Sequence, residues 1–255
     1  MSTKIKSTIL VVDIGNTSTS VGYYCKGRIS RTERCRSRFQ SLEEVLPLVT
    51  AKPIDAVVVA SVVPPVNARW KRAFQQAGLP APLFIDHKLE LGVSVDYPKP
   101  GNIGADRLAN AAAAARLLGT PSVVCDFGTA LTFDVIEGQR GYVGGIICPG
   151  LPLMFDYLSE KTALLPHVKP SKTKAVVGRN TVQAMQIGAR LGYRGMVREI
   201  LQSLEKELGA KKLPVCCTGG YAGWIFKDWD IEATIDPNLT LKGLGIIGEL
   251  NSNNS

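Results

Sequence analysis

A short acidic turn that contains glycine occurs twice in the sequence. The first copy is DIGNT at residues 13–17, and the second is DFGTA at residues 126–130. Each follows a short apolar run, residues 9–12 or 123–125, with the length and β-branched content of a buried strand. Both turns are therefore predicted at strand ends, where a carboxylate, a glycine that lets the backbone turn and a threonine hydroxyl suit phosphate and a hydrated cation.

The similarity between the two copies continues beyond the turns. In each copy a second apolar strand, a glycine-containing reversal and a third strand follow, with the second strands at residues 18–24 and 130–136. Taken singly, either turn is also compatible with an ordinary reversal, since Asp and Gly are common in turns. The repeated context favours a duplicated unit. Gly119-Thr120-Pro121 is the expected boundary, which gives domains 1–118 and 119–255.

Two related halves that each present such a turn to one cleft resemble the acetate kinase, sugar kinase, Hsp70 and actin superfamily. The resemblance implies an α/β fold of two RNase H-like (actin-like ATPase) domains with an interdomain cleft. The rest of the chain alternates in the same way between strand and helix patterns. Strands are predicted at residues 54–61, 83–85 and 213–218, and helices at 42–49, 64–76, 108–118, 151–158, 181–208 and 239–250.

The charge of the chain favours anionic partners. Thirty Lys and Arg against 22 Asp and Glu give a net charge of +8, which suits nucleotides and carboxylates as well as nucleic acid. Most basic residues are scattered, and for the five arginines of residues 28–38 we expect a solvated or phosphate-facing edge. No nucleic-acid partner is therefore predicted.

Other classes of protein are disfavoured by what the sequence lacks. Six cysteines form no CxxC pair, so we interpret them as reduced core thiols, and two histidines with no nucleophile motif argue against a His-driven hydrolase. No stretch reaches the ~18 apolar residues of a membrane span, and the run that ends at Asp13 is too short for a signal peptide. We expect a cytoplasmic protein without a membrane partner.

A carboxylate lies at the start of the predicted helix 108–118. Asp106 belongs to the segment Gly104-Ala105-Asp106-Arg107, a few residues after Tyr97. One interpretation is a helix N-cap, which Asp performs for about 1 kcal/mol. The other is a carboxylate that accepts the proton of a substrate hydroxyl as its oxygen attacks phosphorus. Position alone leaves both open.

Three glycines interrupt the long helical pattern that begins at Thr181. Gly188, Gly192 and Gly195 would each cost about 1 kcal/mol relative to Ala in an isolated helix. They indicate close packing on another element, and a dimer partner is one candidate.

Short motifs occur in a fixed order along nearly the whole chain. They are DIGNTSTS at 13–20, Tyr97, GADR at 104–107, DFGTALTFD at 126–134, GGIICPGL at 144–151, TALLP at 162–166, GRNTVQAMQ at 178–186, TGGYA at 218–222 and LTLKGL at 239–244. In order and spacing the chain resembles the type III pantothenate kinases. Each motif is short, but their joint occurrence is specific. Residues 101–103 (GNI) and Ile187 depart from the usual pattern without removing an expected catalytic group.

The resemblance implies transfer of the ATP γ-phosphoryl group to the primary hydroxyl of pantothenate, the first step of coenzyme A biosynthesis, by a homodimer. ATP is expected at Asp13, Ile14, Gly15, Asn16, Thr17, Ser18, Thr19, Ser20 and Thr129. Pantothenate is expected at Tyr97, Gly104, Ala105, Asp106, Arg107 and Thr181, the last reaching the site of the partner. Asp106 would accept the proton, Asp13 would hold Mg²⁺ through water, and Asp126 would bind a monovalent cation, K⁺ or NH₄⁺.

Two alternatives stay open. A regulatory or accessory homologue without activity would keep the fold but tend to lose a carboxylate, whereas Asp13, Asp106 and Asp126 are all present. A kinase of the same superfamily that acts on a sugar or carboxylate is disfavoured by the TALLP and NTVQAMQ segments.

Overall fold

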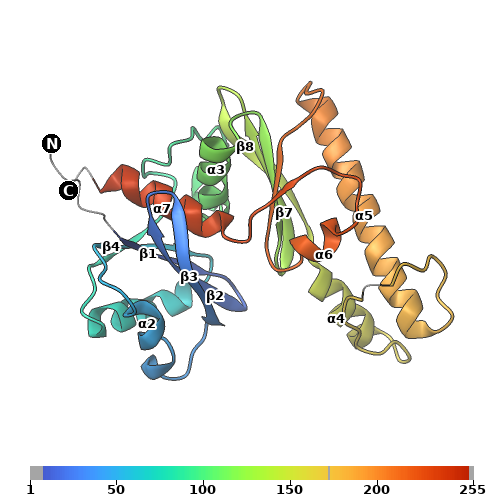
Figure 1. The fold of residues 1–255 in the computed structure, drawn as a ribbon, viewed down its shortest axis with the longest axis horizontal. Coiled ribbons are helices and arrows are strands. Elements are labelled where there is room, and N and C mark those ends of the chain that lie inside the picture. Colours follow the sequence, from blue (N-terminus) through green and yellow to red (C-terminus); the bar gives the residue numbers. More distant parts are fainter. Residues whose placement is uncertain (1–7, 172, 253–255) are drawn as a thin grey trace. The chain divides into compact units, whose positions relative to one another are not determined.

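The structure is a computed structural model that describes residues 8–171 and 173–252. The chain divides into two compact units (Figure 1). The first comprises Met1–Thr120, Asp134–Gly144 and Asn238–Ser255, and the second comprises Pro121–Phe133 and Gly145–Pro237. The expected division into domains 1–118 and 119–255 stays a prediction.

A five-stranded mixed sheet forms the centre of the first unit. Its order is β3-β2-β1-β4-β5, with β1 at Ile9–Ile14, β2 at Ser18–Cys25, β3 at Arg28–Arg36, β4 at Ala56–Ser61 and β5 at Pro82–Phe84. β1 pairs antiparallel with β2 and parallel with β4, and β4 pairs parallel with β5. The central strand β1 is apolar at successive residues because both of its faces are covered.

Helices cover the two faces of this sheet. Leu10 and Val12 belong to a core with Trp70 of α2 (Pro64–Gln76) and the short helix α1 (Leu46–Val49). Ile9 and Val11 point the other way, into a core with α3 (Ala105–Leu117) and α7 (Leu239–Asn251). The first unit is therefore a layered α/β structure, which confirms the predicted class.

A second five-stranded sheet has the order β10-β9-β6-β7-β8. Its strands are β6 (Ser122–Phe127), β7 (Ala130–Glu137), β8 (Gly141–Pro149), β9 (Val215–Thr218) and β10 (Thr234–Ile235). β6 pairs parallel with β9. The helices of the second unit are α4 (Leu151–Lys161), α5 (Thr181–Glu207) and α6 (Ala222–Phe226). The ring of Phe127, at the end of β6, packs against Tyr193 of α5 and Phe226 of α6.

The repeat seen in the sequence is also a repeat of burial. β1 and β6 share one pattern, with four buried residues, a partly buried Asp and a final buried residue. β2 and β7 share a second pattern of eight positions. Asp13 and Asp126 therefore occupy equivalent places, one residue before the end of their strands.

Most predicted elements occur within a few residues of their expected bounds. The predicted helix 42–49 is instead split into a 3₁₀ turn, η1 (Leu42–Glu44), and α1. Pro47 explains the break, because its ring nitrogen cannot donate the hydrogen bond that a continuous helix requires there. All six cysteines are free thiols; Cys125, Cys216 and Cys217 lie in the core as expected, whereas Cys25, Cys35 and Cys148 are only partly buried. Within residues 8–171 and 173–252, no helix has the length and apolarity to cross a bilayer.

The glycines of α5 make no close contact within the described chain, so the dimer partner stays the candidate for their predicted packing. Around Gly188, Gly192 and Gly195, no other part of the described chain comes within 4 Å of where a Cβ would stand. Packing inside the chain therefore does not account for them.

The glycines of α7, by contrast, let this helix approach its neighbours closely. A Cβ on Gly243 would lie 1.9 Å from the Ala109 carbonyl oxygen of α3, and one on Gly245 would lie 2.1 Å from the Tyr24 ring. α7 can therefore approach α3 and the sheet only without side chains at these positions.

We expect Gly243→Ala to lower the free energy of unfolding by about 2 kcal/mol or more, because overpacking outweighs the gain in helix propensity. Urea unfolding followed by circular dichroism measures the change. Gly223→Ala in α6 is the matched control, since no atom lies within 4 Å of its Cβ position. Equal stability of both variants would contradict the close packing of α7.

Candidate functional site

The first acidic turn connects β1 to β2. The Gly15 amide donates to the Ser18 carbonyl at 3.2 Å, and the Ile14 carbonyl accepts from the Val62 amide at 3.1 Å. Asn16 and Thr17 are exposed at the tip. Gly15 does not adopt a positive φ; its Cβ would instead lie 3.0 Å from the Ser18 carbonyl oxygen, so close approach rather than backbone freedom favours glycine here.

A buried serine, Ser37, supports this turn from the residue that follows β3. The Ser37 hydroxyl donates to the Gly15 carbonyl at 2.6 Å and lies 3.0 Å from the Thr19 hydroxyl. Both hydroxyl residues are almost fully buried. Arg34, from the arginine cluster, donates through Nε to the Ser18 hydroxyl at 2.7 Å. Sequence reasoning missed Ser37, because nothing in its local pattern indicates that it contacts the turn.

Two glycines from elsewhere in the sequence, Gly150 and Gly219, lie close to the second acidic turn. Gly219 follows β9 with a φ of +85°, and its Cβ would lie 2.6 Å from the Asp126 Oδ1 atom. Gly150 precedes α4, and its Cβ would lie 2.0 Å from the Thr129 carbonyl oxygen. Gly128 itself has no positive φ and no close contact that a Cβ would prevent. A carboxylate and backbone carbonyls thus gather at the end of β6.

Asp106 lies in the first turn of α3. The N-cap residue is Gly104, so Asp106 is not the N-cap, although its Oδ1 atom accepts the Arg107 amide at 2.8 Å. A Cβ on Gly104 would lie 2.5 Å from the same oxygen, so this glycine makes room for the carboxylate. Burial raises the pKa of Asp106, and the neighbouring Arg107 opposes that shift. The result is a partly desolvated carboxylate at a helix start.

Arg107 is held by residues that sequence reasoning did not single out. Its Nε atom donates to the Asp134 Oδ1 atom at 2.5 Å. Its guanidinium lies over the Tyr142 ring, 5.7 Å from the centroid. Asp134 is fully buried, and burial raises its pKa to about 6 even though the neighbouring Arg107 partly opposes that shift. Only the tertiary structure brings β7 and β8 residues to α3.

Tyr97 is positioned by β8. The Asp96 amide donates to the Tyr142 carbonyl at 2.9 Å, and the Tyr142 amide donates to the Ser94 carbonyl at 2.8 Å. The Tyr97 and Tyr142 rings lie 6.1 Å apart, and the Tyr97 ring also packs on Gly144. Tyr97 is 37% exposed, so part of its side chain is accessible.

The expected site residues are divided between the two units. The first unit holds residues 13–20, Tyr97 and residues 104–107, and the second holds Asp126, Thr129 and Thr181. Thr181 is the first residue of α5, and the helix is capped by Asn180, whose side chain accepts the Gln183 amide at 2.9 Å. Ile187, which departs from the family pattern, is buried within its own unit.

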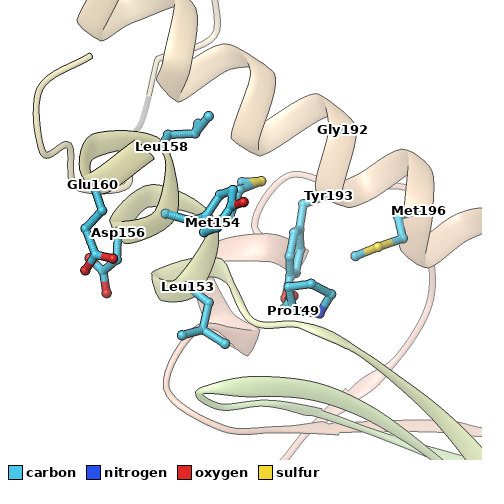
Figure 2. Close-up of a pocket in the computed structure, with 10 residues that line it drawn as sticks. Pro149, Leu153, Met154, Asp156, Leu158, Glu160, Gly192, Tyr193 and Met196 are labelled. Carbon is cyan, nitrogen blue, oxygen red and sulfur yellow. The ribbon is translucent and has the colours of Figure 1, made fainter. Parts of the chain in front are cut away.

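An apolar cavity of about 850 Å³ lies between α4 and α5. Figure 2 shows Met154 projecting from α4, and Tyr193 and Met196 projecting from α5. The Tyr193 hydroxyl donates to the Pro149 carbonyl at 3.2 Å, at the base of α4. The cavity belongs wholly to the second unit and contains none of the expected site residues.

Candidate metal ligands are few. The described residues contain no group of three or more His, Cys, Asp or Glu side chains that would enclose a metal ion. Mg²⁺ in nucleotide sites uses one or two carboxylates together with substrate phosphates. A single carboxylate at the end of β1, Asp13, fits that requirement.

Sequence comparisons identify relatives over most of the chain. The family model described as type III pantothenate kinase matches residues 9–203. The chain is 49% identical over 212 residues to the type III pantothenate kinase of Akkermansia muciniphila, covering 83% of this chain and 84% of that protein. It is 39% identical over 243 residues to that of Methylacidiphilum infernorum, covering 95% and 88%.

Solved structures of low sequence identity share the fold. A Campylobacter jejuni protein described as a Baf family transcriptional activator has a TM-score of 0.63 at 19% identity, with 96% of this chain and 99% of that chain covered. MreB5 of Spiroplasma citri bound to AMPPNP has a TM-score of 0.51 at 12% identity, with 97% and 98% covered. These likenesses show an actin-like fold. Because the family model and both relatives align with most of its length, the chain belongs to the type III pantothenate kinase family.

Proposed function

We propose that this protein transfers the γ-phosphoryl group of ATP to the primary hydroxyl of pantothenate, giving 4′-phosphopantothenate in coenzyme A biosynthesis. Family membership supports the reaction. The observation that carries the site is Asp106, a partly buried carboxylate at the start of α3, beside an arginine that is itself held in place. The expected location in the cytoplasm stays a prediction.

Asp106 is proposed as the proton acceptor. Phosphoryl transfer depends mainly on positioning and charge neutralisation, so one base and no covalent nucleophile are needed. Burial raises the pKa of Asp106, which makes the carboxylate a better base than an exposed aspartate. Arg107, Tyr97 and the Gly104–Ala105 backbone are proposed to contact pantothenate, with the Arg107 guanidinium on its carboxylate. Thr181 is the remaining proposed contact.

The first acidic turn is proposed to bind the ATP phosphates. Residues 13–20 are proposed to contact the phosphates at the turn between β1 and β2, except for the Thr19 hydroxyl, which is buried against Ser37. Ser37 also fixes the backbone at Gly15. Thr129 is proposed as a further nucleotide contact. Asp13 would hold Mg²⁺ through water, and the bound ion would neutralise charge on the phosphates.

Asp126 is proposed to bind a monovalent cation. Its carboxylate and the carbonyl of Thr129 lie beside Gly219 and Gly150, where any larger side chain would fill the space next to them. Oxygen ligands of this kind, a single carboxylate with backbone carbonyls, suit K⁺ or NH₄⁺. The ion would add positive charge near the nucleotide.

A homodimer is proposed through α4 and α5. Gly188, Leu191, Gly192 and Gly195 recur at a spacing that places them on one face of α5. Leu191 is 42% exposed, and the described chain leaves the three glycines uncovered. Leu153 and Tyr157 are exposed on α4. The apolar cavity of Figure 2 lies between α4 and α5, and Leu153, Tyr157 and Gly192 line it. An uncovered apolar surface of this kind indicates a protein contact.

For the catalytic role, we expect Asp106→Asn to lower kcat by ~10²-fold or more while circular dichroism stays unchanged. Coupled ADP-release assays with pantothenate, ATP, Mg²⁺ and K⁺ measure the rate. Asp86→Asn is the matched control, since Asp86 also accepts a nearby backbone amide at 2.8 Å but lies outside the site. A near-wild-type rate for Asp106→Asn would leave that residue a structural role only, and an inactive wild type would favour a regulatory homologue.

For the cation site, we expect turnover to fall several-fold when K⁺ and NH₄⁺ are replaced by tetramethylammonium at constant ionic strength. The wild type should recover on addition of K⁺, whereas Asp126→Asn should show little response to it. Turnover that is independent of the cation would contradict the proposed site.

For the dimer, we expect Leu191→Glu to weaken self-association by about tenfold or more, because a buried, uncompensated charge costs more than the 1.4 kcal/mol that tenfold requires. Sedimentation velocity measures the dimer fraction. Activity should fall in parallel if Thr181 completes the partner's site. Leu117→Glu on α3 is the control, since Leu117 is comparably exposed at 51%. A wild type that is monomeric at micromolar concentration would overturn the proposal.

A further inference from the structure

A buried polar network connects the helices α3 and α7 of the first unit to Asp134 of β7. The Thr240 hydroxyl of α7 donates to the Asn110 Oδ1 atom at 2.8 Å. The Asn110 amide of α3 donates to the Asp134 Oδ2 atom at 3.5 Å, and Arg107 Nε donates to Oδ1 at 2.5 Å. Both oxygens of the carboxylate therefore have a donor.

The network is buried at one end and reaches solvent at the other. Asp134 and Asn110 are almost fully buried, whereas the Arg107 side chain is 15% exposed. Replacing a buried ion pair by well-packed apolar residues is often neutral or stabilising. Stability of the fold alone is thus a weak reason for a carboxylate at this position. The end of the network that reaches solvent is Arg107, the residue next to Asp106.

We propose that Asp134 is a positioning residue, which orients the Arg107 guanidinium for the pantothenate carboxylate. This rests on the proposed contact between Arg107 and the substrate. The bond to Nε fixes the rotation of the guanidinium, and the Tyr142 ring at 5.7 Å covers one of its faces. A guanidinium that is already oriented loses less side-chain entropy when the substrate binds.

The fixed geometry makes a specific kinetic prediction. Asp134 acts on substrate binding through Arg107 and contacts neither the transferred group nor the nucleotide in this proposal. Loss of its carboxylate should therefore weaken binding of pantothenate equally in the ground state and the transition state, which raises KM and leaves kcat little changed.

The test is steady-state kinetics on the full-length protein. We expect Asp134→Asn to raise the KM for pantothenate about tenfold, the effect typical of losing a charged hydrogen bond, with the KM for ATP within about twofold of wild type. Glu137→Gln is the matched control on the same strand, because Glu137 also pairs with an arginine, Arg140, but at the surface. It should change neither KM.

A double-mutant cycle separates positioning from a purely structural role. Once Arg107→Met has removed the oriented group, adding Asp134→Asn should raise the KM for pantothenate no further. Additive effects, an unchanged KM in Asp134→Asn, or equal rises in both KM values would overturn the proposal. If Asp134→Asn does not fold, Asn110→Ala is tested instead, because it removes the donor to the other oxygen of Asp134. A rise confined to the KM for pantothenate supports the proposal, and unchanged KM values overturn it.

The outcomes also distinguish this proposal from the proposed function. If the wild type does not phosphorylate pantothenate, the function itself is wrong. If the wild type is active but Arg107→Met keeps its KM for pantothenate, the roles of Arg107 and Asp134 are wrong while the activity stands.

Discussion

The close contact between α3 and α7 is the packing interaction on which the first unit depends. Gly243 brings the backbone of α7 against the Ala109 carbonyl, and the alanine-rich face of α3 has no large side chains to prevent it. Each glycine in a helix interior costs about 1 kcal/mol relative to alanine. The burial of both helices against β1 and β4 offsets that cost. The start of α3, with Asp106 and Arg107, is thereby fixed relative to the sheet.

The same packing explains how charged groups are tolerated in this part of the molecule. A buried carboxylate is costly unless it is paired and hydrogen-bonded. Asp134 meets that condition through Arg107 and Asn110, and Thr240 of α7 in turn satisfies Asn110. Because α7 lies so close to α3, the Thr240 hydroxyl of α7 can donate directly to Asn110 of α3. The close packing of α7 on α3 is therefore also what completes the hydrogen bonds of the buried carboxylate.

Much of the fold and part of the candidate site could be predicted from local sequence. The strand before each acidic turn was predictable because continuous β-branched runs are typical of strands buried on both faces, and β1 and β6 share one burial pattern. Asp106 was predictable as a helix-start carboxylate. The reason for glycine in the first turn was not predictable from local sequence. A side chain at Gly15 would crowd the Ser18 carbonyl oxygen, whereas the φ of Gly15 does not require glycine. Likewise, nothing local marks Ser37 as the support of that turn.

The sequence by itself determined the repeated strand-turn-strand units, the helix starts and the family, because these depend on residue order and on periodicity over a few positions. Only the tertiary structure decided which distant residues support the site. Asp134 accepts a hydrogen bond from Arg107, Ser37 donates one to the Gly15 carbonyl, and Gly219 lies close to the Asp126 carboxylate. The physical reason is that each of these contacts joins segments far apart in the chain, whose meeting depends on sheet order and helix packing. The local sequence pattern of a segment predicts neither the sheet order nor the helix packing.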